Sequence, residues 1–135
     1  MVQLESEAQK LLLEPKSSHR ILIIDDDKRA RGILGEFLSA KGYQILTAGN
    51  GEEGLIVLRS AKVDLALLDY GLPDMDGLTL LAEIRKDDES TKIIMITGND
   101  TMEVVAKAAG AGISAYLVKP FKLDVLLKRV EQALG

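Results

Sequence analysis

The stretch that decides the fold is residues 21–27, which read ILIIDDD. Four apolar residues without polar alternation are typical of a strand buried on both faces, as in a parallel sheet covered by helices. Residues 28–41 then carry apolar side chains at helical spacing, namely Ala30, Ile33, Leu34, Phe37 and Leu38. Gly42 is placed to end this helix as a C′ glycine. The stretch therefore predicts a buried strand that leads through acidic residues into a helix.

The same alternation continues to the end of the chain. Further strands are expected over residues 43–48, 65–68, 93–96 and 115–118, and further helices over residues 52–61, 78–84, 102–109 and 123–134. Leu55 and Leu58 are expected to face inward on the helix over residues 52–61, and Met102, Val105, Ala106 and Ala109 mark the helix over residues 102–109. Regular alternation of this kind predicts a doubly wound α/β fold with a parallel five-stranded sheet.

Composition limits the function. The chain has 135 residues, of which 47% are hydrophobic, which suits one domain with a real core. The net charge of −4 provides no basic surface for nucleic acid. There is no cysteine, and His19 is the single histidine, so thiolate zinc sites and histidine-rich metal sites are excluded. No apolar run approaches the roughly 20 residues that span a bilayer, and no signal peptide is visible, so we expect a cytoplasmic protein without a membrane segment.

Residues 1–18 lie outside the strand and helix pattern, so we expect an N-terminal extension there and a single domain over residues 19–135. Leu4, Ala8, Leu11 and Leu12 have helical spacing within the extension. An extra helix or a frayed leader is one interpretation. A linker remnant or a dimerisation helix is the other, and the sequence does not decide between them.

Chemically distinctive residues fall where the expected strands end. In open parallel sheets, ligands bind at the carboxyl ends of the strands. The side chains delivered there are Asp25, Asp26 and Asp27 after the first strand, Thr47 after the second, Asp69 after the third, Thr97 after the fourth and Lys119 after the fifth. The sequence has no Walker A or G-x-G-x-x-G motif, so nucleotide binding has no support.

Asp25, Asp26 and Asp69 are expected to share one site. Two carboxylates 4 Å apart repel by about 4 kcal/mol at an effective dielectric of 20, so a cation or protonation must offset their charge. Oxygen ligands without histidine or cysteine favour Mg²⁺, and one such ion with Lys119 would neutralise the three acids. The alternative is that the first acids only cap the next helix and face solvent, a role that suits Asp27. It does not explain Asp69.

Asp69 is the candidate nucleophile. A carboxylate beside a divalent cation can attack phosphorus and form an acyl phosphate. Thr97, followed by the small Gly98, and Lys119 are placed to contact the phosphoryl group, and Pro120 restricts the backbone beside the lysine. Residues 73–77 are interpreted as a turn before a helix, without a chemical role.

Four segments together resemble the receiver domain of two-component response regulators. They are residues 23–26, residues 67–77, residues 96–98 and residues 116–121, and the resemblance runs from about residue 20 to residue 135. It implies the flavodoxin-like (βα)5 fold. It also implies that Asp69 is the phosphoacceptor, that Asp26 binds Mg²⁺ directly and that Asp25 acts more through water.

Further roles are implied by the resemblance alone. The backbone carbonyl of Gly71 would complete the metal ligands, and Thr97 with Lys119 would contact the phosphoryl group. Tyr116 would be the aromatic switch residue that moves inward as Thr97 shifts, although a half-buried strand aromatic is also plausible there. Gly71 and Asn99 occupy the variable positions that tune how long the phosphoryl group lasts.

The leading hypothesis is therefore a phosphorylation-controlled signalling switch, not an enzyme with outside substrates. A sensor histidine kinase or phosphotransfer protein would phosphorylate Asp69. The surface formed by the fourth helix, fifth strand and fifth helix would change and control a downstream protein or a missing effector domain. A phosphorylation-dependent dimer is a further expectation, and direct binding to nucleic acid is not expected.

Two alternatives belong to other classes. A haloacid-dehalogenase-like phosphatase also uses an aspartate nucleophile and Mg²⁺, but it requires a second acid where this chain has Gly71. A flavodoxin-like binding module shares the fold, but clustered acids are a poor cradle for an anionic flavin phosphate.

Overall fold

The computed structural model describes residues 19–98 and 102–135, apart from the side chains of residues 102 and 103. The strands are β1 (Arg20–Ile24), β2 (Gln44–Ala48), β3 (Leu65–Asp69), β4 (Lys92–Thr97) and β5 (Ala115–Val118). The helices are α2 (Lys28–Ala40), α3 (Gly51–Ser60), α4 (Gly77–Arg85), α5 (Met102–Gly110) and α6 (Leu123–Leu134). Each range predicted from the sequence agrees with the observed one to within a single residue at either end. The predictions for residues 1–18 and for Asn99 lie outside the described residues.

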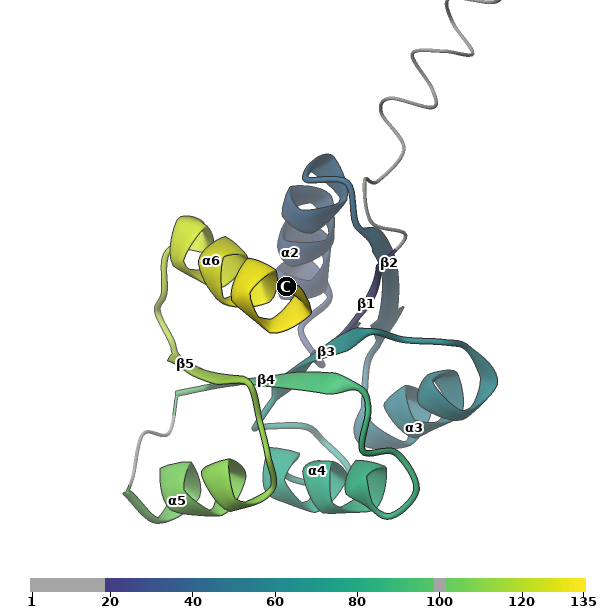
Figure 1. Cartoon of the computed structure of the whole chain (residues 1–135), viewed down its shortest axis with the longest axis vertical. Helices are drawn as coiled ribbons and strands as arrows, with labels where there is room; N and C mark the ends of the chain where they lie inside the picture. Colours follow the sequence, from purple (N-terminus) through teal and green to yellow (C-terminus); the bar gives the residue numbers. More distant parts are fainter. Residues whose placement is uncertain (1–18, 99–101) are drawn as a thin grey trace, which may run out of the picture.

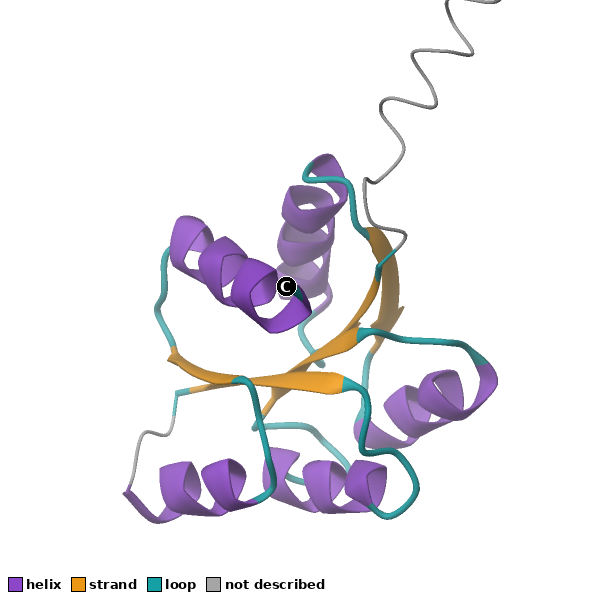
Figure 2. Cartoon of the chain, in the orientation of Figure 1, coloured by secondary structure: helices purple, strands orange, loops and turns teal. Residues whose placement is uncertain are grey.

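The five strands form one parallel sheet in the order β2-β1-β3-β4-β5. Helices α2 and α6 cover one face, and α3, α4 and α5 cover the other (Figures 1 and 2). The doubly wound α/β fold predicted from the sequence is therefore confirmed. The strand order reverses between β1 and β3, which is where this architecture binds its ligands.

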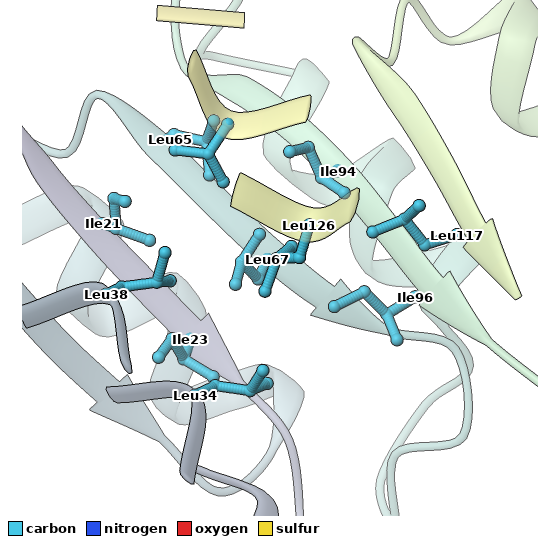
Figure 3. Close-up of a cluster of buried hydrophobic side chains, with 11 residues drawn as sticks. Ile21, Ile23, Leu34, Leu38, Leu65, Leu67, Ile94, Ile96, Leu117 and Leu126 are labelled. Atoms are coloured by element: carbon cyan, nitrogen blue, oxygen red, sulfur yellow. The ribbon is translucent and has the colours of Figure 1, made fainter. Parts of the chain in front are cut away.

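Successive side chains of a strand point to opposite faces of the sheet. Helices cover both faces, so the apolar side chains on each face are buried. Along β1, Ile21 and Ile23 join the cluster under α2 and α6, whereas Leu22 and Ile24 join the cluster over α3 and α4. Figure 3 shows the first of these clusters. Full burial of one such side chain contributes about 1.5–3 kcal/mol, so the paired clusters dominate the stability of the fold.

Two helices bury side chains other than those the sequence indicated. On α2, Leu34 and Leu38 are buried as predicted, but Ile33 is 50% exposed. On α5, the described buried side chains are Val104 and Ala108, each one position before Val105 and Ala109, which mark this helix in the sequence. Nearly every residue of α5 is apolar or small, so periodicity alone predicts the helix without fixing its rotation.

Helix α3 meets the core through glycine. Leu55 and Leu58 are only partly buried, whereas Gly51 and Gly54 are buried. A Cβ on Gly51 would lie 2.7 Å from the Met75 side chain. A Cβ on Gly54 would lie 2.6 Å from Ile24 Cδ1. The helix therefore approaches its neighbours more closely than an apolar stripe would allow.

Strand register brings the predicted site residues to one edge of the sheet. Ile24 pairs with Leu68, so the residues that follow them, Asp25 and Asp69, are neighbours. Asp69 in turn pairs with Ile96, the residue before Thr97. Thr97 pairs with Val118, the residue before Lys119. None of the described helices has the length and apolar character that crossing a bilayer would need.

Candidate functional site

Three carboxylates converge at the carboxyl edge of the sheet. One oxygen from each of Asp25, Asp26 and Asp69 lies within 4.8 Å of the others. Asp25 is 4% exposed and Asp69 is 7% exposed, whereas Asp26 faces solvent. The structure thus brings together the three acids that the sequence assigned to one site.

The turn between β1 and α2 holds Asp25 in place. Asp27 is the N-cap of α2, and its carboxylate accepts a bond of 2.9 Å from the N–H of Arg29, which confirms the predicted cap. The N–H of Asp27 donates to Asp25 Oδ1 at 2.9 Å. Arg31 Nη1 donates to the backbone carbonyl of Asp25 at 2.7 Å. Both the side chain and the backbone of Asp25 are therefore fixed from α2.

The electrostatic environment of Asp25 is unfavourable to its charge. Burial raises its pKa above the usual 3.8, and the carboxylates of Asp69 and Asp26 raise it further. The hydrogen bond from the Asp27 N–H and the ammonium of Lys119 oppose this rise without cancelling it. The site is therefore one in which bound positive charge would be stabilising.

Lys119 supplies one positive charge. Its Nζ lies 3.3 Å from Asp69 Oδ1, and its side chain is 41% exposed whereas that of Asp69 is 9% exposed. Its backbone N–H donates to the carbonyl of Thr97 at 2.8 Å, and its peptide bond to Pro120 is cis. The ammonium thus reaches the candidate nucleophile from the end of β5, which β4 separates from β3.

The other predicted residues lie around this cluster. Thr97 is 1% exposed at the end of β4. Gly71 is exposed in the β3–α4 loop, two residues after Asp69, and forms an isolated bridge with Asp76. Tyr116 is half-buried on β5, pairs with Met95 and packs against the cluster on the α3 and α4 side. Tyr116 thus sits further from the edge than Thr97, one strand away.

The donor set suits a hard divalent cation. All three carboxylates offer oxygen, and two of them are buried beside one another with a lysine that balances only one charge. Mg²⁺ typically takes one or two protein carboxylates and keeps several waters, which fits a site whose third acid is open to solvent. The residues present could therefore hold such an ion.

Sequence reasoning missed three residues that shape this site. Arg31 fixes the Asp25 carbonyl, Asp74 bonds to the first turn of α3, and Gly77 packs against the loop that follows Asp69. Gly77 had a signal, because a glycine directly after the α4 N-cap Asp76 is unusual enough to ask what it touches. Arg31 and Asp74 had none, since both bond to backbone groups and the partners of Asp74 are 22 and 23 residues away in the sequence.

The fold and the site define a doubly wound protein with a buried carboxylate and a candidate cation site at its switch point. Residues 21–131 match the response regulator receiver domain family. The chain belongs to that family, whose members are phosphoacceptor switches in two-component signalling and not enzymes in the ordinary sense. The resemblance to receiver domains stated from the four segments is therefore confirmed.

Individual relatives agree with this assignment. The transcriptional regulatory protein GlrR of Escherichia coli is 36% identical over 119 residues, which cover 88% of this chain and 27% of that protein. This chain therefore spans about a quarter of that relative's length.

Solved structures show the same architecture. A CheY-like receiver domain protein from Methanospirillum hungatei is 36% identical with a TM-score of 0.84, and the match covers 87% of this chain and 94% of that one. The response regulator protein TrrA from Thermotoga maritima, solved in complex with Mg²⁺ and BeF, is 38% identical with a TM-score of 0.78. That match covers 86% of this chain and 99% of the TrrA chain.

Proposed function

We propose that Asp69 receives a phosphoryl group from a histidine kinase or phosphotransfer protein in a Mg²⁺-dependent reaction. The observation that carries this proposal is the environment of the Asp69 carboxylate. It is buried, it pairs with Lys119, and one of its oxygens lies within 4.8 Å of carboxylate oxygens of Asp25 and Asp26. The TrrA structure, which holds Mg²⁺ and BeF, supports the choice of metal.

The transfer requires one bond to form and one to break. A carboxylate oxygen of Asp69 attacks the phosphorus, the bond from phosphorus to the donor histidine nitrogen breaks, and that nitrogen keeps the electron pair and takes up a proton. The product is an aspartyl phosphate. Attack by water later breaks the bond between the phosphorus and the Asp69 oxygen, and it yields inorganic phosphate and the free carboxylate.

The residues around Asp69 would have two roles, which are to bind Mg²⁺ and to contact the phosphoryl oxygens. Asp25, Asp26, Asp69 and the carbonyl of Gly71 would hold Mg²⁺, which supplies positive charge against the carboxylates and the phosphoryl oxygens. The Lys119 ammonium stays on the side where it now meets Asp69 Oδ1 and would bind a phosphoryl oxygen there. The Thr97 hydroxyl, at the end of the adjacent strand, would donate to another.

Phosphorylation would then be sensed on the surface formed by α5, β5 and α6. Thr97 lies at the end of β4, which pairs with β5 and so with the strand that carries Tyr116. A shift of Thr97 toward the phosphoryl group would leave room for Tyr116 to move inward and would favour an alternative packing of this surface. A downstream protein or an effector domain would bind the changed surface.

The same proposal includes the domain boundaries, the oligomeric state and the location of the protein. We place the receiver domain at residues 19–135, with residues 1–18 as an extension. A phosphorylation-dependent dimer, the absence of nucleic-acid binding and a cytoplasmic location stay predictions.

Beryllofluoride tests the proposed function, because it mimics a phosphoryl group on a carboxylate. We expect the parent chain to bind it only when Mg²⁺ is present, with amide chemical shifts changing at Asp69, Thr97 and Lys119 in NMR spectra. Asp69→Asn should show no such change, because the amide cannot replace the attacking carboxylate oxygen. An acyl-phosphate donor should likewise label the parent and leave Asp69→Asn unlabelled.

Asp87→Asn is the matched control, since Asp87 is an exposed carboxylate paired with Arg59 at 3.8 Å and has no place in the site. It should bind and label like the parent. Equal labelling of Asp69→Asn and the parent would refute the proposal.

A further inference from the structure

Asp74 joins the loop after Asp69 to a different helix. It lies in the β3–α4 loop, three residues beyond Gly71. Its Oδ1 accepts a bond of 2.9 Å from the N–H of Gly51, and its Oδ2 accepts one of 2.9 Å from the N–H of Glu52. Both donors belong to the first turn of α3, 23 and 22 residues away in the sequence. One carboxylate thus bridges two parts of the structure with both of its oxygens.

The first turn of α3 depends on this bridge. The N-terminal N–H groups of a helix have no partner within the helix. Asn50, the N-cap, accepts from the N–H of Glu53 at 2.8 Å, and Asp74 takes the two N–H groups between them. A negative charge at a helix N-terminus also interacts favourably with the helix dipole. The bridge therefore satisfies two groups that the local sequence of α3 leaves without a partner.

The same bridge constrains the short loop that contains Gly71. On the α4 side, Gly71 forms its bridge with Asp76, and the N–H of Gly77 donates to the carbonyl of Tyr70 at 2.7 Å. On the α3 side, Asp74 supplies the only side-chain hydrogen bonds that the described residues make between this loop and that helix. The loop is thus attached to α4 on one side and to α3 on the other. Gly71 lies between Tyr70, whose carbonyl bonds to Gly77, and Asp74, whose carboxylate bonds to α3.

The α3 end of this connection is itself tied to the acidic cluster. Helix α3 follows β2 almost directly, and the carbonyl of Ala48, the last residue of β2, accepts from the N–H of Asp25 at 3.1 Å. Two hydrogen bonds and the short backbone segment between Ala48 and Gly51 therefore connect Asp25 to Asp74.

We propose that Asp74 is a positioning residue that sets the cation affinity of the site by holding the Gly71 carbonyl at a fixed distance from Asp25 and Asp26. This inference rests on the proposed function, in which that carbonyl is a Mg²⁺ ligand. Residues that orient metal ligands contribute about 10- to 100-fold to metal affinity. Asp74 acts through the backbone of an exposed loop, so we expect an effect at the low end of that range.

Titration with Mg²⁺ alone tests the inference, with the amide signals of Asp69 and Gly71 followed by NMR. We expect Asp74→Ala to raise the dissociation constant for Mg²⁺ about tenfold. Asp74→Asn should fall between Asp74→Ala and the parent, because the amide keeps only one of the two oxygens that now accept from α3. At saturating Mg²⁺, the rate of phosphorylation by an acyl-phosphate donor should return to within about twofold of the parent rate in both variants.

Asn50→Ala is the matched control. It removes the other side-chain cap of the same helix, so it should lower the stability measured by urea unfolding by a similar amount. It leaves the tie to the loop in place, so its affinity for Mg²⁺ should equal that of the parent.

The outcomes separate the inference from the proposed function. An unchanged affinity in Asp74→Ala, or an equal loss of affinity in Asn50→Ala, would overturn the inference while the parent still binds Mg²⁺ and beryllofluoride. A parent chain that takes up neither would overturn the proposed function and the inference with it.

Discussion

At the scale of single residues, Asp25 is a buried carboxylate that would favour binding of a cation and that lowers the stability of the metal-free protein. It is almost fully buried, and two other carboxylates lie within 4.8 Å. Only a backbone N–H and a lysine at the far side of Asp69 oppose the resulting rise in its pKa. Without a bound cation, the negative charge of Asp25 therefore destabilises the folded state.

Asp25→Asn should stabilise the metal-free protein by about 1 kcal/mol at neutral pH, a size typical of a single stabilising substitution. The amide keeps an oxygen that can accept from the Asp27 N–H, so the turn retains its hydrogen bond. Urea unfolding in the presence of EDTA measures the difference. The same variant should bind Mg²⁺ more weakly, because it removes one carboxylate from the cluster.

The pH dependence of this effect has a definite sign. The pKa of Asp25 is higher in the folded state than the 3.8 of the unfolded chain, so the folded state holds the proton more tightly. The contribution of Asp25 to the stability of the parent should fall as the pH rises from about 3.8 through its folded pKa, whereas the lowered pKa values of Asp74 and Asp88 act in the opposite direction in both proteins. The variant should lack this fall, so the two proteins should differ less at about pH 4 than at neutral pH. A variant less stable than the parent at neutral pH would contradict this account.

At the scale of elements, the junction between β3 and α4 is built on a close approach of backbones. A Cβ on Gly77 would lie 2.8 Å from the Cα of Tyr70 and 3.2 Å from the carbonyl oxygen of Asp69. The φ angle of Gly77 is not positive, so contact and not backbone conformation requires glycine there. The start of α4 can therefore lie directly against the loop that follows Asp69.

Gly77→Ala should lower the free energy of unfolding by about 2 kcal/mol, because a backbone atom cannot move aside as a flexible side chain can. It should also weaken Mg²⁺ binding, since Asp69 and Gly71 flank the residue that would be displaced. Thermal or urea unfolding and a Mg²⁺ titration measure the two effects.

Gly32→Ala is the control for this substitution. Gly32 lies within α2, where an added Cβ would meet nothing within 4 Å. Alanine should stabilise α2 there by up to about 1 kcal/mol and leave Mg²⁺ affinity unchanged. A Gly77→Ala protein as stable as Gly32→Ala would contradict the close approach.

The elements and the acidic cluster could be predicted from the sequence because they depend on local patterns and one topological rule. Apolar runs such as residues 21–24 identify buried strands, and parallel strands bring their carboxyl ends to one edge, which joins Asp25 to Asp69. The contacts of Asp74 and Gly77 depend on how two loops meet in space. Sequence periodicity carries no information about contacts between loops, so the pattern of residues 73–77 indicates only a turn before a helix.

At the scale of the whole molecule, the two ends of the sheet differ in the kind of contacts that connect their loops. At the end opposite the site, Arg85 donates to the carbonyls of Thr91 at 2.9 Å, Asp88 at 3.0 Å and Ala111 at 3.2 Å. These bonds tie the α4–β4 loop to the α5–β5 loop. At the site end, three carboxylates converge and Lys119 pairs with Asp69. A change of charge on Asp69 therefore acts on the end of the sheet where electrostatic contacts gather.

Helix α5 is the element best placed to respond to such a change. It follows β4 and packs beside α4, and both helices have nine residues. Helix α4 buries Leu80, Leu81 and Ile84 almost completely, whereas the described buried side chains of α5 are Val104 and the small Ala108. Fewer buried apolar atoms mean a lower free energy of local opening.

Amide hydrogen exchange should therefore be faster in α5 than in α4 in the metal-free protein, because less apolar area is exposed when α5 opens. The equal length of the two helices makes α4 an internal control for end fraying. Addition of Mg²⁺ and beryllofluoride should change exchange in α5 and β5 by a larger factor than in α4, because the proposed switch repacks the α5–β5–α6 surface. The same reagents should leave the Asp69→Asn protein unchanged. Exchange in α4 as fast as in α5, or a response to beryllofluoride centred on α4, would show that a different element carries the signal.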